Sequence, residues 1–187
     1  MIVRRLKLLV SVLAVLAALA GCSSHASSTA SASGGGQSTF FDTGKRQPAP
    51  KLTGDLLDGG TFDLAQHRGE VVVVNFWASW CGPCRAEAAE LAAVADATKS
   101  QRVSFVGIDV RDDRDKAKAF VDSHGITYPS LFDPAGRTAL DFAKVPPTAI
   151  PSTIIVDRQG RIAALYTKAL VREELEPAVS KVAAERA

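Results

Sequence analysis

The sequence predicts an α/β domain, because strand-like and helix-like segments alternate along the chain. An apolar, β-branched run at 71–76, interrupted only by Asn75, indicates a strand that is buried on both faces of a sheet. A segment rich in Ala, Glu and Leu at 83–97 has no internal helix breaker and predicts a helix. A second apolar run at 103–110 completes a strand–helix–strand unit, so we expect a largely parallel sheet at the centre.

The remaining segments extend this pattern. They predict, in chain order, a hairpin turn within 56–62, a helix at 112–124, strands at 129–132, 152–156 and 162–166, and a closing helix at 171–185. The helix at 112–124 begins with acidic residues and stops before Gly125, which is typical of helix ends. Asp157-Arg158-Gln159-Gly160 separates the last two strands, which therefore form a hairpin in a layered α/β or α+β domain.

Residues 1–21 are typical of an export signal. Arg4, Arg5 and Lys7 precede an apolar segment at 8–20 that is broken only by Ser11. This segment is shorter than the about 20 apolar residues that a bilayer-spanning helix needs. The alternative is a short membrane anchor that is never cleaved.

The end of the signal, Leu19-Ala20-Gly21-Cys22, resembles the bacterial lipobox. The resemblance implies a diacylglyceryl group on the Cys22 thiol, cleavage before Cys22 and acylation of the new amino terminus. Two or three acyl chains make a stable membrane anchor. An incidental cysteine is the alternative, but the small residues before Cys22 and the polar tract after it argue against that. We therefore expect the protein on the extracytoplasmic face of a bacterial membrane, where disulfides persist.

A linker and a single domain follow. Residues 22–45 are mostly small and polar, with Gly34-Gly35-Gly36, and predict a flexible linker. Residues 46–187 form a domain of about 140 residues, which is large enough for its own core.

The charge of the chain without its signal is nearly balanced. Three of the 22 basic side chains belong to the signal, which holds no acidic residue, so 19 remain against 20 acidic ones. No concentrated basic stretch remains, and nucleic acid is not an expected partner.

The chemistry is expected at Cys81 and Cys84. Cys81 follows the first predicted strand and stands where a helix begins, and a helix N-terminus lowers the pKa of a thiol. The resulting thiolate is the species that attacks disulfides. Pro83 suits a first helical turn, and Gly82 leaves open space beside the attacking sulfur. Cys84 lies one turn after Cys81 and is positioned to resolve a mixed disulfide.

A C-x-x-C spacing also occurs in zinc sites and structural disulfides. A zinc site needs two more thiol or imidazole ligands, but the histidines at positions 25, 67 and 124 are scattered. A c-type haem site needs His directly after the second cysteine, where this chain has Arg85. We therefore expect no metal and no cofactor beyond a redox-active Cys81–Cys84 disulfide.

The flanking residues indicate a family. The stretch Phe76-Trp77-Ala78-Ser79-Trp80-Cys81-Gly82-Pro83-Cys84 closely resembles the active-site stretch of thioredoxin. Ala49-Pro50, 69–75 and 150–157 with Gly160 extend the likeness. Together they resemble the membrane-tethered TlpA/ResA/CcmG family of extracytoplasmic thioredoxins, over residues 47–185. The resemblance implies a thioredoxin fold, with a central mixed sheet flanked by helices and the family's extra strand–helix insertion in roughly 108–132.

The resemblance also implies a substrate-binding face. Pro151 matches the family's cis-proline, which faces the cysteine pair and helps to hold an extended substrate chain, with Ile150 before it. Without the resemblance a trans bond would be expected, since cis bonds are about 5–6% of X–Pro bonds. Trp80, which adjoins the pair, is expected to line the same face with Gly82 and Pro83.

Two polar residues complete the expected site. Glu87 matches an acidic position of the family that exchanges protons with the thiols, whereas a solvated surface glutamate is the alternative. Asn75 stands six residues before Cys81, where cytoplasmic thioredoxins carry a buried aspartate.

The expected activity is dithiol–disulfide exchange with extracytoplasmic protein thiols or disulfides. The resemblance implies a reductant that prepares apocytochrome c thiols for haem attachment in cytochrome c maturation, with a membrane electron donor or acceptor such as a CcdA/DsbD-like protein. A DsbE-like protein disulfide oxidase remains an alternative. A copper chaperone would need Cys-x3-Cys with a well-placed His, and a peroxiredoxin-like peroxidase would need Thr-x-x-Cys. Neither pattern surrounds the cysteine pair.

Overall fold

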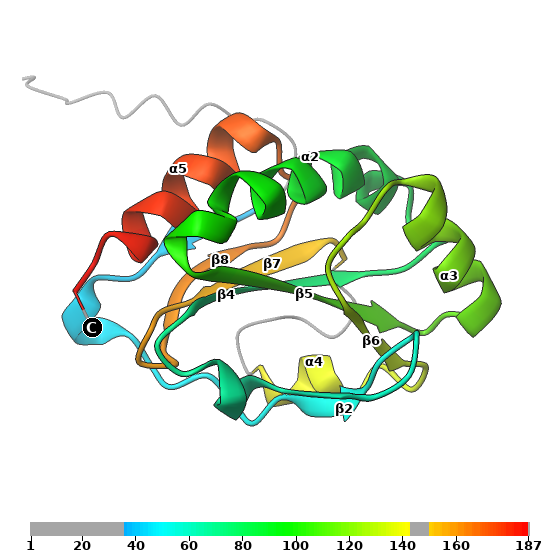
Figure 1. Ribbon diagram of the computed structural model, residues 1–187, viewed down its shortest axis with the longest axis horizontal. Helices are drawn as coiled ribbons and strands as arrows, with labels where there is room; N and C mark the ends of the chain where they lie inside the picture. The colour runs from blue at the N-terminus through cyan, green and yellow to red at the C-terminus, as the bar shows by residue number, and fades with distance from the viewer. Residues whose placement is uncertain (1–35, 143–149, 187) are drawn as a thin grey trace, which may run out of the picture. The chain divides into compact units, whose positions relative to one another are not determined.

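A computed structural model describes residues 36–142 and 150–186 of the chain, and each predicted strand and helix is present in it (Figure 1). The elements are β1 Ser38–Phe40, η2 Thr43–Lys45, β2 Thr53–Asp55, β3 Thr61–Asp63, η3 Leu64–His67, β4 Val71–Trp77, α2 Gly82–Thr98, η4 Lys99–Gln101, β5 Val103–Val110, α3 Arg114–Ser123, β6 Ser130–Asp133, α4 Thr138–Asp141, β7 Ser152–Val156, β8 Ile162–Tyr166 and α5 Arg172–Ala183. The predicted signal peptide and Cys22 lie outside the described residues.

The central sheet is mixed, as the family resemblance implies. Its strand order is β1-β8-β7-β4-β5-β6. β4, β5 and β6 run parallel, whereas β7 is antiparallel to β4, and β8 is antiparallel to β7. The segment 108–132, where the extra strand–helix insertion was expected, holds α3 and most of β6. Within the described ranges no helix is long and apolar enough to cross a membrane.

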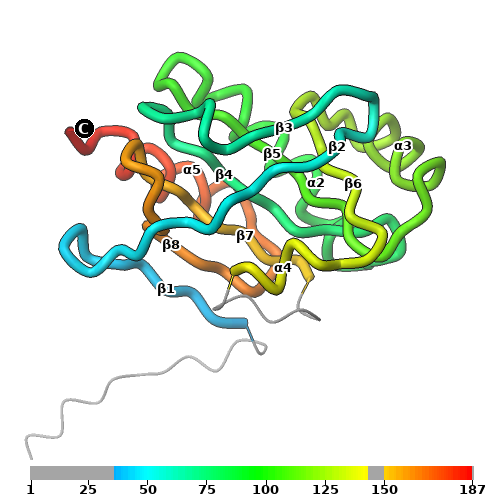
Figure 2. Tube along the Cα trace, turned by 90° about the horizontal axis from the view of Figure 1, so that it is seen from below, coloured from blue at the N-terminus to red at the C-terminus, as the bar shows by residue number. Residues whose placement is uncertain are grey.

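Two layers cover the sheet, because successive residues of β4 point to opposite faces. Val71 and Val73 pack with Leu91 of α2 and Leu175 of α5. Val72 and Val74 pack into a second cluster with the β2–β3 hairpin and the residues around α4. Figure 1 shows α2 and α5 above the sheet and β2 and α4 below it, and Figure 2 shows the second layer from below. All seven residues of β4 are buried, as the unbroken apolar run predicts.

The strand β1 is an addition to the predicted elements. It pairs with β8, with Ser38 opposite Tyr166, although it lies within the segment 22–45 that was predicted as linker. Its stability comes from tertiary contacts. Phe41 packs against the core, and the Lys181 ammonium nitrogen lies 4.2 Å from the centroid of the Phe40 ring. Two consecutive aromatic residues distinguish this part of the segment from the polar tract before it.

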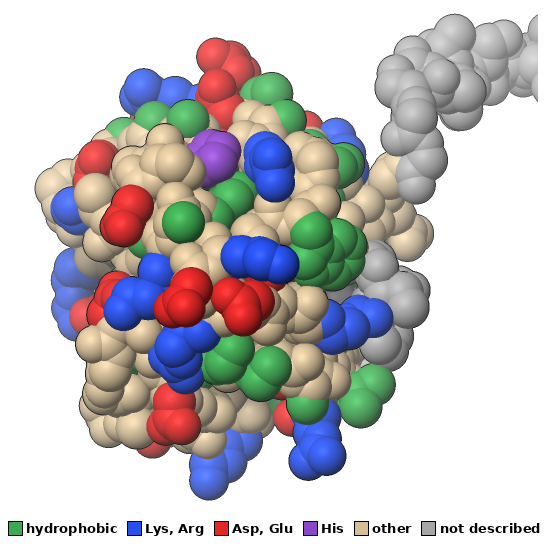
Figure 3. All heavy atoms as spheres, turned by 90° about the vertical axis from the view of Figure 1, so that its right-hand side faces the viewer, with side chains coloured by type: hydrophobic (Ala, Val, Ile, Leu, Met, Phe, Trp, Pro, Cys, Tyr) green, Lys and Arg blue, Asp and Glu red, His purple; other side chains and the backbone are tan. Residues whose placement is uncertain are grey.

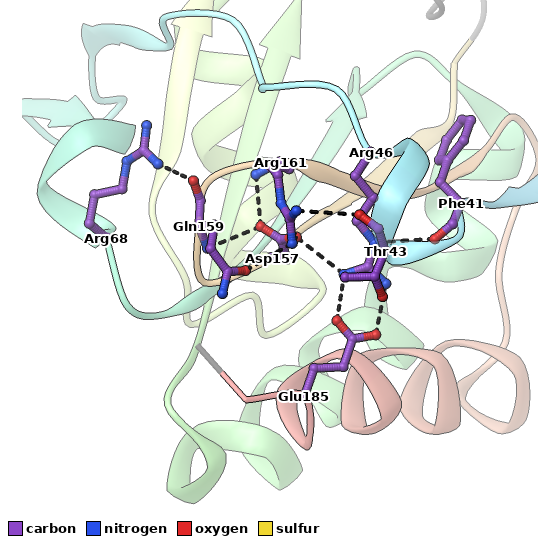
Figure 4. A network of polar contacts seen from close by, with 8 residues as sticks. All are labelled: Phe41, Thr43, Arg46, Arg68, Asp157, Gln159, Arg161 and Glu185. Atoms are coloured by element: carbon purple, nitrogen blue, oxygen red, sulfur yellow. Dashed lines mark hydrogen bonds and ion pairs between the residues drawn. The ribbon is translucent and has the colours of Figure 1, made fainter.

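A buried arginine links the start of the domain to its end (Figure 4). The Arg46 side chain is 1% exposed; its Nη1 donates to Asp157 at 3.2 Å, and its Nη2 donates to Glu185 at 2.7 Å. Its Nε donates to the Phe41 carbonyl at 3.2 Å. Asp157, at the β7–β8 turn, also accepts from Arg161 Nε at 2.9 Å. These contacts join the chain before β2 to the β7–β8 turn and to Glu185, which follows α5.

Arg46→Met should destabilise the protein by about 3 kcal/mol, because removing one partner of a buried ion pair leaves the other uncompensated. Chemical denaturation of the oxidised protein measures this change. Lys45→Met is the matched control, since its pair with Asp42 is exposed and should contribute less than about 1 kcal/mol. Equal losses in the two variants would show that the Arg46 network does not stabilise the fold.

Candidate active site

The cysteine pair lies at the junction of β4 and α2. Cys81 is the N-cap of α2, and Pro83 occupies the first turn, as the sequence predicts. Cys81 and Cys84 form a disulfide with a Cα–Cα distance of 5.3 Å. The Cys84 amide donates to Cys81 Sγ at 3.2 Å, so one amide of the first helical turn points at the first sulfur. After reduction, this amide and the helix dipole stabilise a Cys81 thiolate.

The surface beside the disulfide is open on one side. Gly82 and Pro83 are exposed, and a Cβ added at Gly82 would meet no atom within 4 Å. Cys81 itself is only 5% exposed in this oxidised form. The sequence suggests a more accessible attacking sulfur at this position. The cause of the low exposure is packing, because both cysteines belong to an apolar cluster with Ala78, against which Ile150 also packs.

Ile150 and Pro151 lie next to this junction. The Ile150–Pro151 peptide bond is cis. Ser152, the first residue of β7, pairs with Phe76 of β4, so the two preceding residues lie beside the end of β4. The register therefore brings Ile150 and Pro151, which are distant in sequence, to the turn that leads into Cys81.

The two tryptophans have different environments. Trp80 is 57% exposed, and its Nε1 donates to the Arg111 carbonyl at 3.0 Å. Its ring therefore offers apolar surface one residue before Cys81. Trp77 is buried and stacks on Phe120 of α3, with ring centroids 4.6 Å apart, so it is a core residue.

Glu87 is a buried residue, which excludes the alternative of a solvated surface glutamate. It is 2% exposed, and its carboxylate accepts from Asn75 Nδ2 at 2.8 Å and from the Leu170 amide at 2.9 Å. Burial raises the pKa of Glu87 to about 7, although these two hydrogen bonds act in the opposite direction. Asn75 Nδ2 also donates to Thr153 Oγ1 at 3.1 Å. Asn75 and Glu87, which the sequence suggests separately, thus form one hydrogen-bonded unit.

The loop after β5 supports the active-site turn, and sequence reasoning missed it. The amide and Oγ of Ser79 donate to the Asp112 carboxylate, with Oγ at 2.9 Å. Arg85 donates to the Ser79 carbonyl through Nε at 3.0 Å and Nη2 at 2.8 Å. A signal was available, because parallel strands end at the same edge of a sheet and polar residues follow both β4 and β5.

One face of the molecule carries mixed charge. Figure 3 shows acidic, basic and apolar side chains together on that face. Among the residues that the structure describes, no group of three or more His, Cys, Asp or Glu side chains is placed to hold a metal ion.

Comparison with known proteins gives relatives with the same chemistry. Residues 46–165 match the AhpC/TSA family. A thiol:disulfide interchange protein of Paracoccus denitrificans, a DsbE homolog, is 42% identical over 105 residues, which are 56% of this chain and 54% of that protein. The thiol:disulfide interchange protein HelX of Rhodobacter capsulatus is 30% identical over 145 residues, with coverage of 75% and 78%. The chain thus matches about half the length of the first relative and over three quarters of the second.

A solved structure agrees with these relatives. A secreted thiol-disulfide isomerase from Corynebacterium glutamicum has the same fold, with a TM-score of 0.76 and 33% identity, over 79% of this chain and 92% of that one. The disulfide at the N-terminus of α2 supplies the reactive pair that such an enzyme needs. The chain belongs to the AhpC/TSA family and, within it, to the thioredoxin-like thiol–disulfide oxidoreductases of the TlpA/ResA/CcmG group.

Proposed function

We propose that this oxidoreductase is a lipid-anchored reductant of extracytoplasmic protein disulfides, including those of apocytochrome c. The observation that most directly supports thiol–disulfide exchange is the Cys81–Cys84 disulfide at the N-terminus of α2, beside an open face. The direction of electron flow is argued from the Cys81-Gly82-Pro83-Cys84 sequence, which resembles reducing thioredoxins. The reaction on cytochrome thiols is argued from the family resemblance, and two relatives carry the name thiol:disulfide interchange protein.

The reaction proceeds in two exchanges. In the reduced enzyme the Cys81 thiolate attacks one sulfur of a substrate disulfide, and the other substrate sulfur leaves as a thiolate that takes up a proton. Cys84 then loses its proton and attacks the Cys81 sulfur, which releases the second substrate thiol. Two electrons pass from the enzyme dithiol to the substrate, and the Cys81–Cys84 disulfide results. A membrane electron donor, such as a CcdA/DsbD-like protein, returns the disulfide to the dithiol.

The substrate chain binds across the open face. Exposed Trp80 supplies an apolar surface, and Gly82 and Pro83 leave the approach to Cys81 clear. Ile150 packs against the cluster that holds both cysteines, and Pro151 follows it beside the end of β4. These five residues are the proposed substrate-binding set.

Glu87 accepts the proton that Cys84 loses in the second exchange. It follows Cys84 by three residues on α2, so the two side chains occupy neighbouring positions on the same buried helix face. A pKa of about 7 places this carboxyl near the pH at which a general base works best.

The anchor is proposed from the lipobox at Cys22. The relative from Corynebacterium glutamicum is described as secreted, which supports an extracytoplasmic location. The lipid attachment rests on Leu19-Ala20-Gly21-Cys22 alone.

Cys81→Ser should abolish insulin reduction in the presence of dithiothreitol, because the attacking thiolate is lost. Cys84→Ser should instead trap a mixed disulfide with substrate, since the second exchange cannot occur. Insulin reduction that survives Cys81→Ser would exclude the mechanism.

The wild-type Cys81–Cys84 couple should have a midpoint potential of about −270 mV, as a reductant requires. A potential of about −120 mV would contradict the proposed direction of electron flow and show an oxidase instead.

Glu87→Gln should slow the second exchange about tenfold or more, because the proton acceptor is removed. In the wild type the rate should rise with pH through about 7, since only ionised Glu87 accepts a proton. The variant should lack this step in a stopped-flow pH profile. Glu90→Gln on the same helix is the control, and identical pH profiles for wild type and Glu87→Gln would remove Glu87 from the mechanism.

Cys22→Ser should release the protein from the membrane, because an acyl chain can no longer be attached to residue 22. Fractionation of cells that express the full chain, with labelled fatty acid, measures this. Retention of the variant in the membrane, or a wild type without label, would contradict the proposed anchor.

A further inference from the structure

A second buried acid, Asp109, lies behind the redox site. It is the penultimate residue of β5, it is 0% exposed, and it pairs with Trp77 of β4 and Phe132 of β6 in the sheet register. Phe105 belongs to the core under α2 and α5, so Asp109, four residues on, points to the same helical side. Asp109 therefore enters the layer that contains both cysteines.

No described donor gives a hydrogen bond to either carboxyl oxygen of Asp109. The polar side chain that it meets is another carboxyl, that of Asp112. Two carboxyls can share a hydrogen bond only when one of them carries a proton. A buried acid that meets no donor is more stable neutral than charged, so the geometry favours a proton at this pair.

The partners of Asp112 decide which acid holds the proton. Asp112 accepts from the amide and Oγ of Ser79 and from the Asp113 amide. These hydrogen bonds lower the pKa of Asp112, although burial acts to raise it. Burial, followed by the charge of Asp112, raises the pKa of Asp109 to about 8. Asp112 is therefore the charged acceptor and Asp109 the donor.

The other charged groups near Asp109 do not replace this proton. They are Arg114 at the start of α3 and Asp133 at the end of β6. The Arg114 guanidinium donates to the carbonyls of Leu56 and Leu57 and lies 4.3 Å from the centre of the Phe132 ring. Asp133 is a further negative charge, which favours the neutral form of Asp109.

We propose that Asp109 is a positioning residue of the redox site. In the working enzyme it keeps its proton and donates a hydrogen bond to Asp112, and Asp112 in turn holds the turn at Ser79. Ser79 stands two residues before Cys81, and Arg85 fixes its carbonyl from the other side. Ionisation of Asp109 would place two carboxylates against each other and push Asp112 away from Ser79. The inference rests on the proposed role of Cys81 as the attacking thiol.

The test compares Asp109→Ala with Asp109→Asn in the full chain. Alanine removes the donor and should lower kcat/KM for insulin reduction about tenfold, since a small displacement of a reacting group is costly. Asparagine keeps a donor toward Asp112 and should recover most of that loss. As the pH rises through about 8, the wild type should lose activity relative to Asp109→Asn, which has no carboxyl to ionise. Asp115→Asn, an exposed acid of α3, should behave as the wild type does.

Infrared spectroscopy adds a readout that does not depend on activity. The oxidised wild type should show a protonated carboxylic acid at pH 7.5 that Asp109→Asn lacks and Glu87→Gln retains. An ionised Asp109 at that pH, or equal losses in the Ala and Asn variants, would overturn the proposal. If Asp109→Ala does not fold, the asparagine variant and the infrared band still decide it. Failure of the proposed function is separate, because it would appear as insulin reduction that survives Cys81→Ser.

Discussion

The redox site depends on β4, because every other part of it is placed relative to the end of this strand. β4 is hydrogen bonded to β5 on one side and to β7 on the other, and all seven of its residues are buried. A shift by one residue would turn each side chain to the wrong face, so the register is strongly specified. β5 brings Asp112 to the turn before Cys81, and β7 begins just after Ile150 and Pro151. Three neighbouring strands thus fix the cysteine pair.

Two buried acids stand on either side of this junction, and their partners separate their roles. Burial raises the pKa of both, Glu87 to about 7 and Asp109 to about 8. Glu87 accepts from Asn75 and from the Leu170 amide, and these donors stabilise its ionised form. Asp109 meets no described donor, so its neutral form is the stable one. The first can therefore release and accept a proton near neutral pH, whereas the second keeps its proton and serves as a hydrogen-bond donor.

The sequence predicts those features that depend on local pattern. An unbroken β-branched run identifies β4, and the helix start identifies Cys81 as its N-cap. The strand β1 could not be predicted, because three residues at the end of a polar tract become a strand only by pairing with β8. The sequence does not decide whether Glu87 is buried, since alanines on several faces of α2 mark no clear polar side. The pairing of Asp109 with Asp112 depends on the chain path through Arg111, which has a left-handed φ of +55°.

The strand β1 also fixes where the described part of the chain joins the sheet. β1 begins at Ser38, opposite Tyr166 at the end of β8, and Tyr166 in turn pairs with Thr153 near the start of β7. The start of β7 lies beside the end of β4, so the chain enters the sheet at the end that carries Cys81. The entry point is three strands from β4, which is about 14 Å at the usual strand spacing. The first described strand thus starts at the same end of the sheet as the reactive pair and not at the opposite end.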